Sequence, residues 1–133
     1  MSNKKIFISV IIVLILGIAI TVLTRENSAP TSPGQYDAFA QCLKDQEAVF
    51  YGAFWCSHCK SQKELFGSSQ KLLPYVECST ANGQGQLQVC KDANIEGYPT
   101  WVFKDGFRLS GELSFKILSE KTSCALPTET NPE

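Results

Sequence analysis

The longest apolar stretch of the chain lies close to its N-terminus. Residues 6–23 (IFISVIIVLILGIAITVL) are nearly all apolar and follow Lys4 and Lys5. Their length is near the lower limit for a membrane-spanning helix, about 17–25 residues. Lysines on the N-terminal side favour a cytoplasmic N-terminus. We therefore predict one transmembrane helix here, with the remainder of the chain on the outer side of the membrane.

A cleaved signal peptide is the alternative interpretation of this stretch. The apolar run is longer than the usual signal h-region, and residues 24–27 (TREN) offer no clear small-x-small cleavage site. An uncleaved anchor is therefore favoured.

A second apolar run, residues 48–55, contains no charge and is typical of a central strand buried on both faces. A helix-compatible stretch follows, over residues 56–68, with Gly67 near its end. Cys56 therefore lies where a buried strand turns into a helix. Its sulfur would face the unpaired N–H groups of the first turn, which favour an exposed thiolate. Cys59 lies close by on a sheltered face, so the pair predicts a dithiol that can open and close.

Two other uses of these cysteines need consideration. A structural disulfide across a two-residue loop is usually strained and reducible. A zinc site would use Cys56, Cys59, His58 and a later cysteine, but zinc frameworks usually show a second C-x-x-C or an H-x-x-x-H, and neither is present. We predict no metal.

The rest of the pattern predicts alternating helices and strands. The first two strands flank a helix, so they are expected to pair in parallel through a right-handed crossover. A Lys-Asp-Gly turn at 104–106 joins the last two strands in a hairpin. The prediction is an α/β domain with one mixed sheet flanked by helices. Its further elements are helices at 36–44, 87–93 and 113–122, strands at 72–78 and 107–110, and a turn with a strand at 95–103.

Composition shifts divide the chain. The predicted parts are a membrane anchor at 1–24, a linker at 25–34, a folded domain at 35–124 and a flexible tail at 125–133. The linker is small and polar and contains prolines. A net charge of −1 and the lack of a basic patch exclude nucleic acid as a partner. Six cysteines are many for 133 residues, and disulfides persist on the outer side of a membrane.

Two motifs resemble those of a known family. Residues 55–60 (WCSHCK) and 97–106 (GYPTWVFKDG), followed by Gly111, look like a thioredoxin-fold domain covering residues 35–124. More narrowly, residues 50–55 (FYGAFW) are similar to the thioredoxin-like half of bacterial vitamin K epoxide reductase homologues. The phrase YVECS, which ends at Ser79, and the later Cys90 carry the same similarity.

The resemblance implies a role for each residue around the motif. Cys56 would be the attacking thiol and Cys59 the resolving thiol. Pro99 would be a cis-proline beside the sulfurs, leaving the backbone of Tyr98 free to pair with a substrate strand. His58 would stabilise the Cys56 thiolate, although a plain solvent-facing residue is the alternative.

The remaining aromatic and sulfur positions are assigned in the same way. Trp55 would be a lid over the sulfurs rather than a pure core residue. The resemblance implies a structural disulfide between Cys78 and Cys90, or otherwise a second redox pair. It implies a further disulfide between Cys42 and Cys124, with two free buried thiols as the alternative.

Three departures from the family affect redox poise and substrate choice rather than the fold. Cytosolic thioredoxins carry a buried acid in the strand before the motif, and Phe50 stands at that position here. The dipeptide between the cysteines is Ser57-His58, where secreted oxidases more often have Pro-His. Tyr98 precedes the proline, where small or β-branched residues are commoner.

The expected function is that of a membrane-anchored thiol–disulfide oxidoreductase facing the periplasm or the cell exterior, acting as an oxidase on cysteine pairs of exported proteins. A quinone-linked membrane oxidase of the vitamin K epoxide reductase or Dsb type would regenerate it, and the domain itself would need no cofactor. The alternatives are a tethered reductase, as in cytochrome c maturation, and a disulfide-stapled binding module without turnover.

Overall fold

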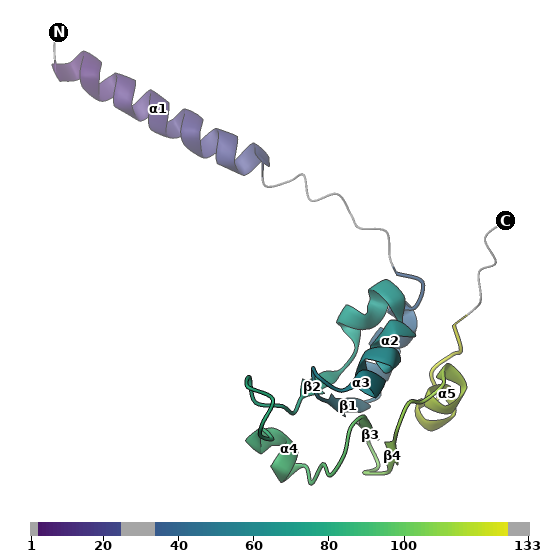
Figure 1. The fold of residues 1–133 in the computed structure, drawn as a ribbon. Coiled ribbons are helices and arrows are strands. Elements are labelled where there is room, and N and C mark those ends of the chain that lie inside the picture. The colour runs from purple at the N-terminus through teal and green to yellow at the C-terminus, as the bar shows by residue number, and fades with distance from the viewer. Residues whose placement is uncertain (1–2, 25–33, 128–133) are drawn as a thin grey trace. The chain divides into compact units, whose positions relative to one another are not determined.

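The computed structural model describes residues 3–24 and 34–127 (Figure 1). The chain divides into two compact units, Met1–Ser32 and Pro33–Glu133. The predicted linker at 25–34 falls outside the described residues except for Gly34, and so does the predicted tail beyond residue 127.

The first unit contains one helix, α1 (Asn3–Thr24). The helix predicted over residues 6–23 is thus confirmed as a helix. Of the residues that the structure describes, however, none form a helix that is both long and apolar enough to cross a membrane. The predicted transmembrane span is therefore not confirmed.

The second unit is built on a mixed sheet with the strand order β2-β1-β3-β4. β1 pairs in parallel with β2 and antiparallel with β3, and β3 and β4 form an antiparallel hairpin, as the sequence predicts. Figure 1 shows α4 on the opposite side of the strands from α2 and α3. The strands are β1 (Val49–Gly52), β2 (Tyr75–Glu77), β3 (Thr100–Val102) and β4 (Arg108–Ser110), and the helices are α2 (Asp37–Asp45), α3 (Ser57–Glu64), the 3₁₀ helix η1 (Gly67–Leu72), α4 (Gln88–Asp92) and α5 (Phe115–Thr122).

Successive side chains of a strand point to opposite faces of the sheet, and a separate hydrophobic cluster lies on each face. On one face Phe50 stacks on Trp101, with ring centroids 4.9 Å apart. This face belongs to the main cluster, which we define as Phe39, Ala40, Leu43, Ala48, Phe50, Ala53, Cys56, Cys59, Phe66, Leu73, Trp101, Phe103, Leu113, Leu118 and Cys124. On the other face, Tyr51 packs against the small cluster, which is Cys78, Cys90 and Ile95.

The prediction that the strand at 48–55 is buried on both faces is wrong for one face. Phe50 and Gly52 are buried, whereas Val49 and Tyr51 are only half-buried. The reason is that the small cluster covers its face of the sheet much less than the main cluster covers the other. An uncharged run therefore indicates a central strand without fixing how completely each face is covered.

Most elements are shorter than predicted, and for two of them a local cause is evident. The helix expected over 56–68 ends at Glu64, and Gly67 then adopts a φ of +52°, a left-handed conformation that suits glycine. The strand expected over 72–78 is reduced to β2, because Pro74 before it has no N–H to donate to the ladder. Neither change alters the order of the strands.

A buried polar side chain fixes α3 against the main cluster. Gln62 is completely buried, and its amide donates to the carbonyl of Leu113 and accepts from Leu113 N at 2.6 Å and from the Trp101 indole at 3.3 Å. Such a group is tolerated in a core only when its hydrogen bonds are satisfied. It therefore sets the position of the helix that carries the two motif cysteines.

Candidate active site

Cys56 is the N-cap residue of α3, at the end of the loop that follows β1. Its side chain makes no capping hydrogen bond to the first turn of the helix. The thiol donates instead to the carbonyl of Tyr98, with a sulfur–oxygen distance of 3.7 Å. The expectation of an exposed sulfur facing free N–H groups needs correction, because Cys56 is only 8% exposed and its sulfur is directed toward the backbone at Tyr98.

Cys59 lies one turn further into the domain and is 1% exposed. Burial raises the pKa of its thiol from 9.0 to about 12. Both sulfurs are present as thiols in this structure, and Cys59 is the more sheltered of the two, as the sequence predicts. A Cβ built on Gly52 would lie 2.9 Å from the sulfur of Cys59, so the strand must carry glycine where it passes this thiol.

The peptide bond between Tyr98 and Pro99 is cis, and Pro99 is fully buried. The structure thus places Pro99 next to the residue whose carbonyl faces Cys56, which is the arrangement the resemblance implies. The roles assigned to these residues in binding substrate remain predictions.

An aromatic rim borders the sulfurs on the solvent side. Trp55 is 54% exposed, its indole N–H donates to Ser79 Oγ at 2.8 Å, and its ring meets that of Tyr98 edge-on at 5.9 Å. Phe54 is 53% exposed beside it. Trp55 therefore stands at the edge of the site rather than in the core.

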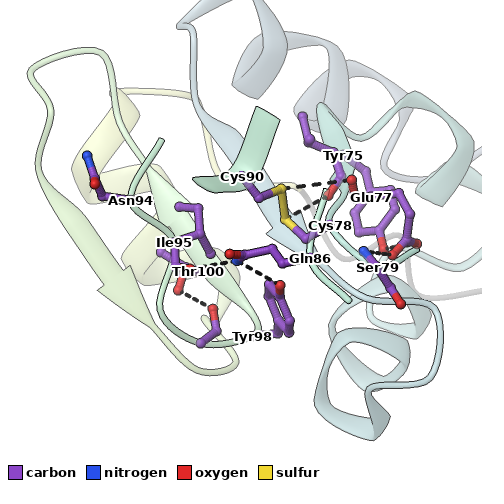
Figure 2. Close-up of a disulfide and its surroundings, with 12 residues drawn as sticks. Tyr75, Glu77, Cys78, Ser79, Gln86, Cys90, Asn94, Ile95, Tyr98 and Thr100 are labelled. Atoms are coloured by element: carbon purple, nitrogen blue, oxygen red, sulfur yellow. Dashed lines mark hydrogen bonds between the residues drawn. A yellow bond between two sulfur atoms is a disulfide. The ribbon is translucent and has the colours of Figure 1, made fainter. Parts of the chain in front are cut away.

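The side chain of Tyr98 is held from the loop that precedes α4. Figure 2 shows the amide of Gln86 against the hydroxyl of Tyr98, to which it donates at 2.9 Å, while the same nitrogen donates to the carbonyl of Ile95 at 2.7 Å. Sequence analysis missed Gln86 and Ser79, because a loop of small polar residues carries no signal of its tertiary partners.

His58 faces outward and pairs with a carboxylate that the sequence did not single out. Its Nδ1 lies 2.7 Å from Glu112 Oε1, and both side chains are exposed. Exposed ion pairs contribute little to stability, and this pair is an ion pair only when the imidazole of His58 is protonated. Elsewhere in the described part of the chain, no group of three or more His, Cys, Asp or Glu side chains could hold a metal ion.

Polar side chains also lie behind Cys59, on the inner side. The ammonium group of Lys63 sits 3.3 Å from the ring centroid of Tyr75, and the hydroxyl of Tyr75 donates to Glu77 at 2.7 Å. Sequence analysis noted Tyr75 and Glu77 only as part of the YVECS phrase and gave none of the three residues a role, since nothing links a helix surface lysine to a distant strand before the fold is known.

The four remaining cysteines form two disulfides, in the pairs that the resemblance implies. Cys42 is joined to Cys124 with an S–S distance of 2.04 Å, and Cys78 to Cys90 at 2.00 Å (Figure 2). Cys78 and Cys90 are completely buried. A second redox role for that pair would require this part of the domain to open.

Comparison with known proteins agrees with this geometry. The sequence profile described as Thioredoxin matches residues 30–117. The chain belongs to the thioredoxin family. The chain is also 46% identical, over 112 residues, to the thiol-disulfide oxidoreductase LTO1 of Arabidopsis thaliana. The match covers 80% of the present chain but only 29% of that relative. With adjacent free thiols at Cys56 and Cys59, the thioredoxin-family domain is a thiol–disulfide oxidoreductase.

Proposed function

We propose that this domain oxidises cysteine pairs of exported proteins through a redox disulfide between Cys56 and Cys59. The observation that carries the proposal is the position of the Cys56 sulfur, 3.7 Å from the Tyr98 carbonyl at the cis Tyr98–Pro99 bond. A substrate strand pairing with this backbone would present its own sulfur to Cys56.

The reaction proceeds by two thiol–disulfide exchanges. A substrate thiolate attacks the Cys56 sulfur, forming a mixed disulfide, and the Cys56–Cys59 bond breaks with Cys59 leaving as a thiolate that takes up a proton. A second substrate thiolate then attacks the substrate sulfur of the mixed disulfide and releases Cys56. The substrate loses two electrons and the Cys56–Cys59 pair gains them.

The aromatic rim supplies a surface for segments that are not yet folded. Phe54 and Trp55 are exposed just before Cys56 in the chain, and the Trp55 ring meets that of Tyr98, so these rings would contact side chains next to the reacting cysteine whatever their sequence. A protein that acts on many exported substrates needs contacts of this kind, which do not depend on the substrate sequence.

The same chemistry in the reverse direction is the second candidate, and one observation favours it. Glu112 places a carboxylate 2.7 Å from His58, which offsets the positive charge that would stabilise a Cys56 thiolate and make the disulfide a strong oxidant. Direction therefore depends on the reduction potential.

The reduction potential distinguishes the two directions. As an oxidase, the protein should have a value above about −230 mV, and His58→Ala should lower it, because loss of the imidazole destabilises the reduced form. Glu112→Gln should shift it the opposite way. A glutathione titration measures all of these, and a wild-type value near −270 mV that His58→Ala leaves unchanged would establish the reductase instead. No turnover of insulin in either direction would indicate a binding module.

The intermediate gives a second test. Replacing Cys59 with alanine removes the resolving thiol, so mixed disulfides through Cys56 should accumulate on non-reducing gels. Trapping by Cys56→Ala instead of Cys59→Ala would reverse the assigned roles.

We also infer that α1 anchors the domain to a membrane, with the domain on the periplasmic or extracellular side. The support is the apolar run at 6–23 behind Lys4 and Lys5, the exposure of apolar side chains such as Phe7 along α1, and two disulfides that persist outside the cytoplasm. The oxidising partner would be a quinone-linked membrane enzyme of the vitamin K epoxide reductase or Dsb type. An impermeant thiol reagent should label Cys56 in intact cells after mild reduction, and labelling only after lysis would refute this location.

A further inference from the structure

Ionisable side chains from two parts of the fold lie near the resolving thiol. Cys56 at the N-cap of α3 and Lys63 within α3 both act on Cys59, and β2 supplies Tyr75, which is bonded in turn to Glu77. β1 passes the same sulfur at Gly52, which has no side chain. A Cβ built on Gly52 would lie 2.9 Å from the Cys59 sulfur and 2.8 Å from the Tyr75 ring, so the strand, the ring and the thiol are packed together.

Lys63 is directed toward this group by the geometry of the helix. It lies four residues after Cys59 on α3, and side chains at that spacing share a face. Its ammonium nitrogen is 3.3 Å from the centroid of the Tyr75 ring, close enough for a strong cation–π contact. The lysine is half-buried, so its charge is poorly screened by solvent.

Glu77 fixes the ring of Tyr75, against which the ammonium group of Lys63 packs. One oxygen accepts the Tyr75 hydroxyl at 2.7 Å, and the other accepts the backbone N–H groups of Ser79 at 2.9 Å and Phe54 at 3.2 Å. Figure 2 shows Tyr75 and Glu77 together on β2. Since three donors fix the carboxylate, the orientation of the Tyr75 ring is fixed as well, and with it the position of the lysine.

We propose that Lys63 is a positioning residue for the resolution step, its ammonium charge stabilising the Cys59 thiolate when the Cys56–Cys59 bond opens, with Tyr75 and Glu77 holding that charge in place. This inference rests on the roles proposed above for the two cysteines. Its effect does not depend on direction, because the Cys59 thiolate is the leaving group in oxidation and the nucleophile in reduction.

The electrostatic need for such a charge is clear from the surroundings. Burial raises the pKa of Cys59 to about 12, and the charge of Lys63 acts in the opposite direction. Burial also lowers the pKa of Lys63, whereas the charges of Glu77 and Cys59 raise it. A buried thiolate without a cation beside it would be a poor leaving group at neutral pH.

The first test needs no turnover. In the Cys56→Ala background five cysteines remain, and Cys59 is the one free thiol because the other four form disulfides. Its alkylation by iodoacetamide at a fixed, mildly alkaline pH reports the thiolate fraction. Lys63→Gln should slow the reaction about tenfold, equivalent to one pKa unit, and Lys63→Arg should keep it within about threefold because arginine retains the charge.

The matched control is Lys60→Gln, which removes an exposed lysine from the same helix, one residue after Cys59, and should change nothing. An unchanged rate in Lys63→Gln would overturn the proposal. Equal losses in Lys63→Arg and Lys63→Gln would overturn it too, since they would identify Lys63 as a proton acceptor rather than a fixed charge.

The second test uses the full chain in insulin reduction. Lys63→Gln should slow resolution about tenfold at neutral pH, and the deficit should shrink as the pH rises and Cys59 ionises without help. A deficit that stays constant with pH would indicate a merely structural loss. If wild-type protein fails to turn over while the alkylation difference remains, the proposed function is wrong, and only the electrostatic effect of Lys63 on the Cys59 thiolate stands.

Discussion

The two hydrophobic clusters of the domain lie on opposite faces of the sheet and each contains a disulfide, yet they differ in what else they contain. The main cluster is rich in aromatic rings: Phe39 and Phe66 contact each other and also Phe115, which packs against the cluster, at centroid distances of 4.9–6.1 Å. The small cluster has three buried members, and two of them are the cysteines of its disulfide.

The clusters also differ in their relation to the active site. Tyr98 packs against both, but its side chain is fixed from the side of the small cluster by Gln86, whose loop lies between Cys78 and Cys90. The disulfide between Cys42 and Cys124 joins α2 to the chain after α5, away from that loop. One bridge thus mainly supports stability, and the other also supports the geometry around Cys56.

Removing the long-range bridge should have the largest effect on stability. Cys42 and Cys124 are 82 residues apart, and a loop of that size corresponds to about 4.5 kcal/mol in the chain-entropy account. Urea unfolding of the double alanine variant should show this loss, while the folded fraction keeps its activity. Loss of activity in protein that is still folded would contradict the separation of the two roles.

Removing the short-range bridge should cost less stability and more function. Cys78 and Cys90 are 12 residues apart, which corresponds to about 3 kcal/mol. The double alanine variant should also lose about tenfold in insulin turnover while folded, because the loop that holds Tyr98 is released. Equal activities in the two double variants, measured where both are folded, would show that the small cluster does not support the site.

Sequence and structure contributed to this comparison in different ways. The C-x-x-C motif and the Tyr98-Pro99 pair are local, so their positions at a strand–helix junction and at a cis bond could be anticipated from the residues and the family resemblance. Strand order followed from the crossover and the hairpin turn. These features depend on neighbours in the chain.

The side chains around the sulfurs could not be anticipated in the same way. Lys63, Glu112 and Gln86 are ordinary surface residue types, and each is part of the site only through its contact with a residue elsewhere in the chain. Their partners lie 12 residues away for Gln86 and 54 for Glu112. No periodicity or spacing in a single sequence connects residues so separated.

A smaller effect is expected when only the contact between the loop and Tyr98 is removed. Gln86→Leu abolishes the hydrogen bonds to the Tyr98 hydroxyl and the Ile95 carbonyl, so it should cost about 1 kcal/mol of stability and raise the KM for a peptide substrate about fivefold. The control is Gln84→Leu, an exposed residue of the same loop. A change in kcat without a change in KM would mean that Gln86 does not act through substrate binding.

The last expected effect appears only at alkaline pH and is confined to the main cluster. In the reduced protein the pKa of Cys59 is about 12, above its ordinary 9.0, because burial disfavours the thiolate. Between these values the unfolded chain releases the proton that the folded chain retains, so the stability contributed by the buried thiol is complete below about pH 9 and is lost as the pH rises toward 12. Urea unfolding of two forms across this range isolates the effect: Cys56→Ala, and Cys56→Ala combined with Cys59→Ala, which differ only in the Cys59 thiol. A difference between the two forms that stays constant with pH would show that Cys59 is not buried as the main cluster requires.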